Sequence, residues 1–392
     1  MKMRKIGVGD IVISKKAKEY VKDVLDTNRL SYGPYSRKFE AKFARMHNCK
    51  NAVFSNSGTD SLRLSLQALK ELGKWNDGDE VIVPAITFIA SSNVIIQNNL
   101  KPVFVDVKLE TYNINPEKIK EAITPKTRAI MPVHLMGLPC DMDPIWELAK
   151  KHKLKIIEDS CESMLAEYKG KKVGSLGDVG CFSTYVAHLL VTGVGGLSTT
   201  NDKKIATKIR SLMNHGRDPY YLSIDDDDNA RGEDLFKIVA KRFNYMSVGH
   251  SARCTEMEAA LGLDQLSSLE EIVAKRQGIA KKFIKNLSHL SDHIQLPTIP
   301  KNRTHSFMLF PILLKNEKKE GLIRYLEKRG IETRDLMPLL NQPIYKKLFG
   351  NIESNYPNAL KIRKNGFYIG CHQYLSNEDI KFITTAINSY FK

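Results

Sequence analysis

The stretch AVFSNSGTDSLRLSLQALKEL, residues 52–72, joins a short apolar run to an amphipathic segment through a turn of small polar residues. The run 52–54 is typical of a buried strand, and residues 60–72 are predicted to be helical. A strand that leads into a helix is the repeating unit of α/β folds. The turn at 55–59 is either a cradle for a phosphate at the helix N-terminus or an ordinary helix cap made by Ser and Thr.

Strands and helices alternate on both sides of this stretch. Further strands are predicted at 80–83, 102–107, 129–133 and 155–158, and helices at 36–47, 116–123 and 143–152. The alternation indicates an α/β domain in which helices cover both faces of a largely parallel sheet.

The pattern changes near Thr255. A long helix is predicted at 255–287, followed by a strand at 307–314 and helices at 321–328 and 380–391. These elements indicate a smaller C-terminal α+β domain. We therefore expect residues 1–250 to form a large domain and residues 251–392 a small one.

Composition narrows the class of protein. The net charge of +16 would suit anionic partners, but charges spread over solvated faces are the preferred explanation. The six cysteines form no C-x-x-C pair, so we expect free thiols rather than a zinc or iron–sulfur run. No apolar stretch approaches the roughly 20 residues of a membrane span, and no signal-peptide or nucleic-acid-binding pattern occurs. We expect a cytoplasmic protein that binds neither membranes nor nucleic acids.

Two further motifs follow predicted strands. Asp159, in the run IEDSCES at 157–163, is placed to hold a pyridinium nitrogen protonated, or to cap a helix. The segment GDVGCFSTYVAH at 177–188 leads to the glycine turn TGVGGL at 192–197. Such a turn indicates tight backbone near a buried ligand, or an ordinary connection between strands. None of these motifs decides the function alone.

The order of the motifs resembles that of the DegT/DnrJ/EryC1/StrS family of sugar aminotransferases over nearly the whole chain. The series is SNSGT at 55–59, PAITF at 84–88, EDSCES at 158–163, GDVGCFS at 177–183 and TEMEAALG at 255–262. The resemblance implies a pyridoxal-phosphate enzyme of fold type I, with a large domain built on a mainly parallel seven-stranded sheet. It also implies a homodimer with its active site at the interface and a nucleotide-sugar substrate.

The resemblance implies roles for individual residues. The expected cofactor-binding residues are Gly58, Thr59 and Ser183 at the phosphate, Phe88 stacked on the ring, Asp159 at the ring nitrogen and Glu162 near the ring hydroxyl. Ser251 stands where the family has an asparagine that a neighbouring subunit adds to the phosphate site. The expected substrate-binding residues are His215, Arg217 and Arg334, with His134 and His372 as further candidates for the pocket.

His188 is the largest departure from the family pattern, which has the Schiff-base lysine at this point. No lysine occurs from Val173 to Asp202, so a shifted alignment cannot supply the missing amine. Imidazole cannot form the Schiff base, but it can act as a general base near neutral pH. In this respect the chain is similar to the 4-keto-6-deoxy-sugar 3-dehydratases, a branch with histidine here that uses pyridoxamine phosphate.

We therefore expect a 3-dehydratase of a nucleotide-activated 4-keto-6-deoxyhexose in deoxysugar or O-antigen (lipopolysaccharide) biosynthesis. His188 would be its base, pyridoxamine or pyridoxal 5'-phosphate its cofactor and an amino acid such as glutamate its amine donor. The alternatives are an aminotransferase-like protein with other chemistry, and a catalytically silent binder of cofactor or nucleotide sugar.

Two further differences bear on this expectation. Some members of the branch hold an iron–sulfur cluster near the position of His215, but no cysteine lies between Cys181 and Cys254 here. We therefore expect neither a cluster nor a metal. Val194 stands where the family usually has Glu, which predicts a substrate pocket unlike that of the known dehydratases.

Overall fold

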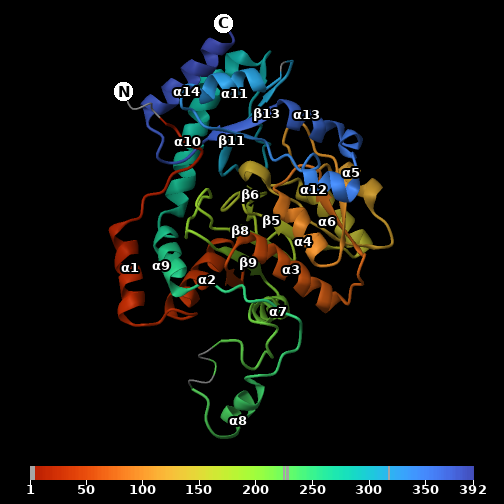
Figure 1. Ribbon diagram of the computed structural model, residues 1–392, viewed down its shortest axis with the longest axis vertical. Coiled ribbons are helices and arrows are strands. Elements are labelled where there is room, and N and C mark those ends of the chain that lie inside the picture. Colours follow the sequence, from red (N-terminus) through yellow and green to blue (C-terminus); the bar gives the residue numbers. More distant parts are fainter. Residues whose placement is uncertain (1–4, 224–225, 227–228, 317) are drawn as a thin grey trace.

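A seven-stranded sheet forms the centre of the protein in a computed structural model that describes residues 5–223, 226, 229–316 and 318–392 (Figure 1). In spatial order its strands are β1 (Asn51–Ser55), β9 (Gly196–Thr200), β8 (Val179–Ser183), β5 (Lys155–Asp159), β4 (Thr127–Ile130), β2 (Glu80–Pro84) and β3 (Lys101–Val105). Neighbouring strands from β8 to β3 are parallel, whereas β9 is antiparallel to both β8 and β1. The predicted α/β class with a mainly parallel, seven-stranded sheet is confirmed.

The helices of this region are α1 (Lys15–Asp26), α2 (Pro34–Met46), α3 (Gly58–Gly73), α4 (Ile89–Gln97), α5 (Pro116–Ala122), α6 (Met142–His152) and α7 (Lys203–Met213). Two of them, α1 and α2, precede the first strand, and the others follow strands along the chain. Helix α3 packs against β8 and β9 and against its neighbours α4 and α7. Every residue of β2 and β8 is buried, as expected for strands covered on both faces.

The C-terminal elements gather at one end of the molecule (Figure 1). Their antiparallel sheet has the order β10 (Ile294–Gln295), β11 (Leu309–Leu314), β13 (Gly366–Gly370) and β12 (Thr333–Asp335). The helices are α10 (Leu269–Leu287), α11 (Glu320–Glu327), α12 (Pro343–Phe349), α13 (Pro357–Asn365) and α14 (Asn377–Tyr390). α10, α11, α14, β11 and β13 contribute to a hydrophobic cluster distinct from that of the main sheet. The division of the chain at residue 250 stays a prediction.

The prediction of one long helix over 255–287 is wrong. The chain forms α9 (Glu256–Gln265), turns through 266–268, and begins again as α10. The hydroxyl of Ser268 donates to the carbonyl of Gln265 at the break, as serine side chains often do where a helix ends. The two helices pack on different partners, since α9 lies against α1 and α2 whereas α10 lies against α14.

One segment stands apart from the rest of the protein. Helix α8 (Gly232–Lys241) projects beyond α7 at the end opposite to α14 (Figure 1). It has no buried residue, and the side chains of Phe236 and Phe243 are 72% and 85% exposed. Across the described ranges, no helix combines the length and apolar character needed to cross a bilayer.

Candidate active site

A cavity of about 690 Å³ lies where the carboxyl ends of β5 and β8 meet the first turns of α3 and α4. Ligands of open α/β sheets bind in this position. The C-terminal strands complete the wall with Arg334 from β12 and Tyr368 from β13. The residues predicted from the sequence that line the cavity are Gly58, Thr59, Phe88, Asp159, Glu162, Ser183, His188 and Arg334.

The first turn of α3 forms one wall. The hydroxyl of Ser57 accepts the backbone N–H of Asp60, so the capping alternative for this motif is confirmed. Gly58 and Thr59 nevertheless line the cavity at the positive end of the helix dipole. A Cβ on Gly58 would lie 2.7 Å from Cβ of Ser183, so this close approach of α3 to β8 requires glycine.

Asp159 ends β5, and both oxygens of its side chain accept a hydrogen bond. The hydroxyl of Ser91 donates to its Oδ2 at 2.7 Å, and the backbone N–H of Cys161 donates to its Oδ1 at 3.2 Å. The hydroxyl of Thr87 lies 2.7 Å from that of Ser91 and extends the chain. These donors fix the orientation of the Asp159 side chain, so that it can serve as an acceptor at the end of β5.

Glu162 lies on the same wall in a different environment. Its Oε2 accepts the backbone N–H of Met136 at 2.6 Å, and the side chain is buried. Burial raises the pKa of Glu162 to about 7. Of the carboxyl groups that line the cavity, Glu162 is therefore the one that changes charge near neutral pH.

His188 lies in the loop between β8 and β9. The backbone N–H of Thr192 donates to the carbonyl of Thr184 at 2.8 Å, which closes the base of the loop, and the N–H of His188 donates to Tyr185. Burial lowers the pKa of His188 to about 4, so the imidazole is neutral at physiological pH. Its Nδ1 is closed to solvent and has no hydrogen-bond partner in the described ranges.

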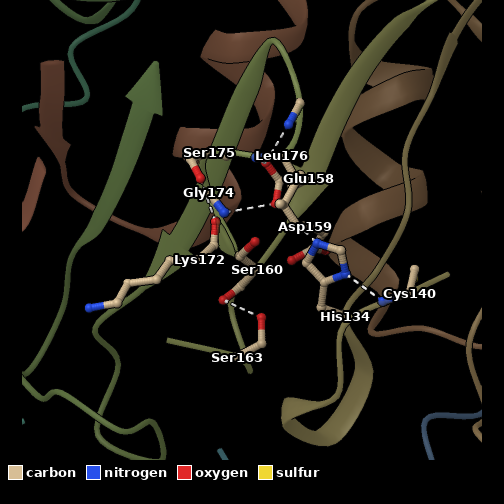
Figure 2. Close-up of polar contacts among 12 residues, drawn as sticks. His134, Cys140, Glu158, Asp159, Ser160, Ser163, Lys172, Gly174, Ser175 and Leu176 are labelled. Atoms are coloured by element: carbon tan, nitrogen blue, oxygen red, sulfur yellow. Dashed lines mark hydrogen bonds and ion pairs between the residues drawn. The ribbon is translucent and has the colours of Figure 1, made fainter. Parts of the chain in front are cut away.

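Behind the cavity, Glu158 supports the end of β5. Figure 2 shows its carboxylate between the turn at Gly174 and Leu176, whose N–H groups donate to it at 2.7 Å, and the ring of His134. Nε2 of His134 lies 3.1 Å from this carboxylate, and its Nδ1 accepts the N–H of Cys140. This ring is therefore neutral and donates from Nε2. His134 serves the core and does not line the cavity.

The remaining candidates lie elsewhere in the single chain. Ser251 and Arg217 line a second cavity of about 570 Å³, between α7 and the residues that precede α9. His215 is exposed beside it, and both His215 and Ser251 lie within reach of the guanidinium of Arg253. None of these lines the first cavity, and neither does His372.

Several residues around the first cavity were not predicted. Ser91 follows Thr87 by one helical turn, and this spacing after the PAITF motif was the signal that could have identified it. Tyr185 lies three residues before His188 in the sequence and could have been identified from that position. Tyr368 and Val8, which come from opposite ends of the chain, reach the cavity only through tertiary packing.

The cavity fits a phosphorylated pyridine cofactor. A helix N-terminus faces it, the side chain of Asp159 offers an acceptor, and Nδ1 of His188 is a buried polar atom without a hydrogen-bond partner in the described residues. No lysine lines it within the part of the chain that the structure describes. In the same residues, no cluster of three or more His, Cys, Asp or Glu side chains is arranged to hold a metal ion.

Comparison with known proteins identifies the class. Residues 12–388 match the DegT/DnrJ/EryC1/StrS aminotransferase family, and the chain belongs to it. The chain is 34% identical to the GDP-perosamine synthase of Caulobacter vibrioides, over 95% of this chain and 94% of the relative. The family comprises pyridoxal-phosphate enzymes that act on nucleotide sugars.

Two solved structures are also similar. The E. coli GDP-4-keto-6-deoxy-D-mannose-3-dehydratase with bound hydrated pyridoxal phosphate has a TM-score of 0.89 and 27% identity, covering 98% of this chain and 99% of its own. A GDP-4-keto-6-deoxymannose-3-dehydratase with a trapped pyridoxal phosphate–glutamate geminal diamine has a TM-score of 0.88 and 26% identity, covering 97% and 100%.

Proposed function

We propose that this protein is a 3-dehydratase of a nucleotide-activated 4-keto-6-deoxyhexose. The proposal rests on the observation that His188, a neutral imidazole, takes the place of the family's lysine. No lysine lines the cavity within the described residues. The likeness to the E. coli 3-dehydratase supports this chemistry. The aminotransferase description of the family supports the rival chemistry, amine transfer to the sugar.

The side chains act as binding, orienting and proton-transfer groups. Gly58, Thr59 and Ser183 hold the cofactor phosphate, and Phe88, 59% exposed at the cavity, offers a face for the ring. Asp159 keeps the ring nitrogen protonated. Arg334 binds the substrate from β12. These assignments belong to the proposal.

Pyridoxamine phosphate, when bound, supplies a primary amine for the sugar ketone and a protonated ring that accepts an electron pair. His188 is the base that removes the proton from the cofactor methylene carbon and returns it during the reaction. In the net reaction the sugar loses its C3 hydroxyl, glutamate becomes 2-oxoglutarate, and ammonia is released. The two electrons that reduce the sugar come from glutamate, and the glutamate adduct in the related structure supports this donor.

A second copy of the chain completes the site in this proposal. Ser251, His215 and Arg217 lie outside the first cavity of their own chain, so they act in a neighbouring one. The exposed Phe236 and Phe243 of the projecting segment support such an interface.

Mixing two inactive variants tests this homodimer. When equal amounts of His188→Gln and Arg217→Ala protomers are mixed at random, about half of the dimers contain one of each. One of the two sites in such a mixed dimer has both residues intact, so the sample should regain about one quarter of the wild-type activity. Self-mixed samples of each variant are the controls. No recovery in a sample shown to contain mixed dimers would argue that both residues act within one chain.

The function is tested by product analysis. The protein is incubated with GDP- or dTDP-4-keto-6-deoxyhexose, pyridoxamine phosphate and glutamate, and sugar, ammonia and 2-oxoglutarate are quantified. A 3-deoxy-4-keto sugar with an equal amount of ammonia is expected. An amino sugar as the sole product would instead assign an aminotransferase. Binding without turnover of either nucleotide sugar would favour a silent binder.

A further inference from the structure

We propose that Glu162 binds the cofactor as a neutral carboxylic acid, which donates a hydrogen bond into the cavity to the hydroxyl oxygen of the cofactor ring. The inference rests on the proposed function, because it takes this cavity to be the cofactor site. It gives the chain a cofactor site whose affinity is linked to protonation of Glu162.

The geometry of the two carboxyl groups carries the inference. Both oxygens of Asp159 accept a hydrogen bond, one from Ser91 and one from the backbone of Cys161. Glu162 accepts only one, from Met136 to Oε2, and its Oε1 has no protein partner within the described residues. Only 7% of the surface of Glu162 is exposed, which limits the water that could stabilise a charge on it.

Within the described residues, no cationic side chain contributes to the electrostatics of Glu162. Asp159 and Cys161 lie on its own segment, and Tyr368 faces it from β13. The cavity is also lined by His188, which is neutral, and by two β12 residues that pair with other side chains, Arg334 with Glu332 and Asp335 with Lys319. Burial, reinforced by the Asp159 carboxylate, raises the pKa of Glu162 to about 7.

Protonation makes the two oxygens complementary in function. One oxygen continues to accept the N–H of Met136, while the other presents an O–H to the cavity. An ionised Glu162 would instead place a second negative charge near the ring oxygen. Cofactor binding should therefore favour the protonated form, and above neutral pH it should be accompanied by proton uptake.

Calorimetric titration with pyridoxamine 5'-phosphate tests the inference. Wild-type protein and Glu162→Gln are compared from pH 6 to pH 9, in buffers of different ionisation enthalpy so that proton uptake is measured directly. The glutamine side chain keeps a hydrogen-bond donor but does not titrate. Ionisation of the cofactor itself affects both proteins equally and therefore cancels in the comparison. Relative to the variant, the wild-type affinity should fall about tenfold per pH unit above pH 7, with additional proton uptake approaching one proton.

The outcomes separate this inference from the proposed function. An affinity ratio that does not change with pH would overturn the role of Glu162 while leaving the cofactor site intact, whereas no binding to wild-type protein at any pH would overturn both. If the pH dependence persists in Glu162→Gln and disappears in Tyr368→Phe, the tyrosine is the titrating group. Infrared difference spectra of wild-type protein give a variant-independent check, because the carbonyl stretch of a protonated carboxyl should appear on binding at pH 8.

Discussion

The hydroxyl of Ser91 donates a 2.7 Å hydrogen bond to Oδ2 of Asp159, which joins the first turn of α4 to the end of β5. Ser91→Ala removes one of the two donors that favour the charged carboxylate. Because hydrogen bonds to charged groups contribute about 1.5–3 kcal/mol, we expect the affinity for pyridoxamine phosphate to fall by about tenfold or more. Thr87→Val removes only the outer member of the chain and should cost less. Calorimetry measures both, and a larger loss in Thr87→Val would contradict this order.

Gly58 should not tolerate a side chain. A Cβ there would meet Cβ of Ser183 at 2.7 Å and Sγ of Cys161 at 3.1 Å, so Gly58→Ala should lower the free energy of unfolding by about 1–3 kcal/mol. Gly278→Ala is the matched control, because this glycine lies inside α10 with no atom within 4 Å of the added Cβ. It should stabilise the protein by about 0.5–1 kcal/mol. Urea denaturation without cofactor measures the unfolding free energy of both variants. Equal changes in the two variants would contradict the predicted clash at Gly58.

His188→Lys should create a covalent cofactor site. Wild-type protein should not retain pyridoxal phosphate after borohydride reduction, because imidazole forms no Schiff base. A lysine at 188 would place a primary amine in the same cavity, so intact-mass analysis should show one attached cofactor per chain in this variant. His188→Gln is the control without an amine. Attachment to wild-type protein would mean that a lysine from elsewhere reaches the cavity.

Acid should destabilise the protein partly through a core histidine. Burial lowers the pKa of His305 to about 3, and its Nδ1 accepts the N–H of Phe307. The unfolded chain binds this proton near pH 6.5 and the folded chain does not, so stability is lost as the pH falls below 6.5. His305→Asn keeps an acceptor without titrating.

Between pH 7.5 and 5.5, the difference in unfolding free energy between wild-type protein and His305→Asn should therefore shift by roughly 1.4 kcal/mol in favour of the variant. Glu162 titrates in the opposite sense in the folded state, and the comparison removes its contribution because both proteins contain it. Urea denaturation at the two pH values measures the shift. A pH-independent difference would mean that His305 titrates normally.

Local pattern was enough to predict most of the fold. The apolar runs of β2 and β5 and the periodicity of α3 and α6 were predicted at or within a few residues of their observed positions. The break between α9 and α10 was missed, because both halves are amphipathic and what separates them is the packing of α9 on α1 and α2. The reversed direction of β9 also follows from its pairing with β1 and β8, which no local pattern contains.

The sequence by itself determined the family and the loss of the lysine at His188, because these depend on the order and identity of residues. Most of the site residues that it predicted line the cavity. Only the tertiary structure decided that His134 belongs to the core with Glu158, and that Ser251, His215 and Arg217 lie away from the first cavity of their own chain. The different environments of Asp159 and Glu162 were likewise decided by folding, because the charge of a carboxyl group depends on its burial and on donors that distant segments bring to it.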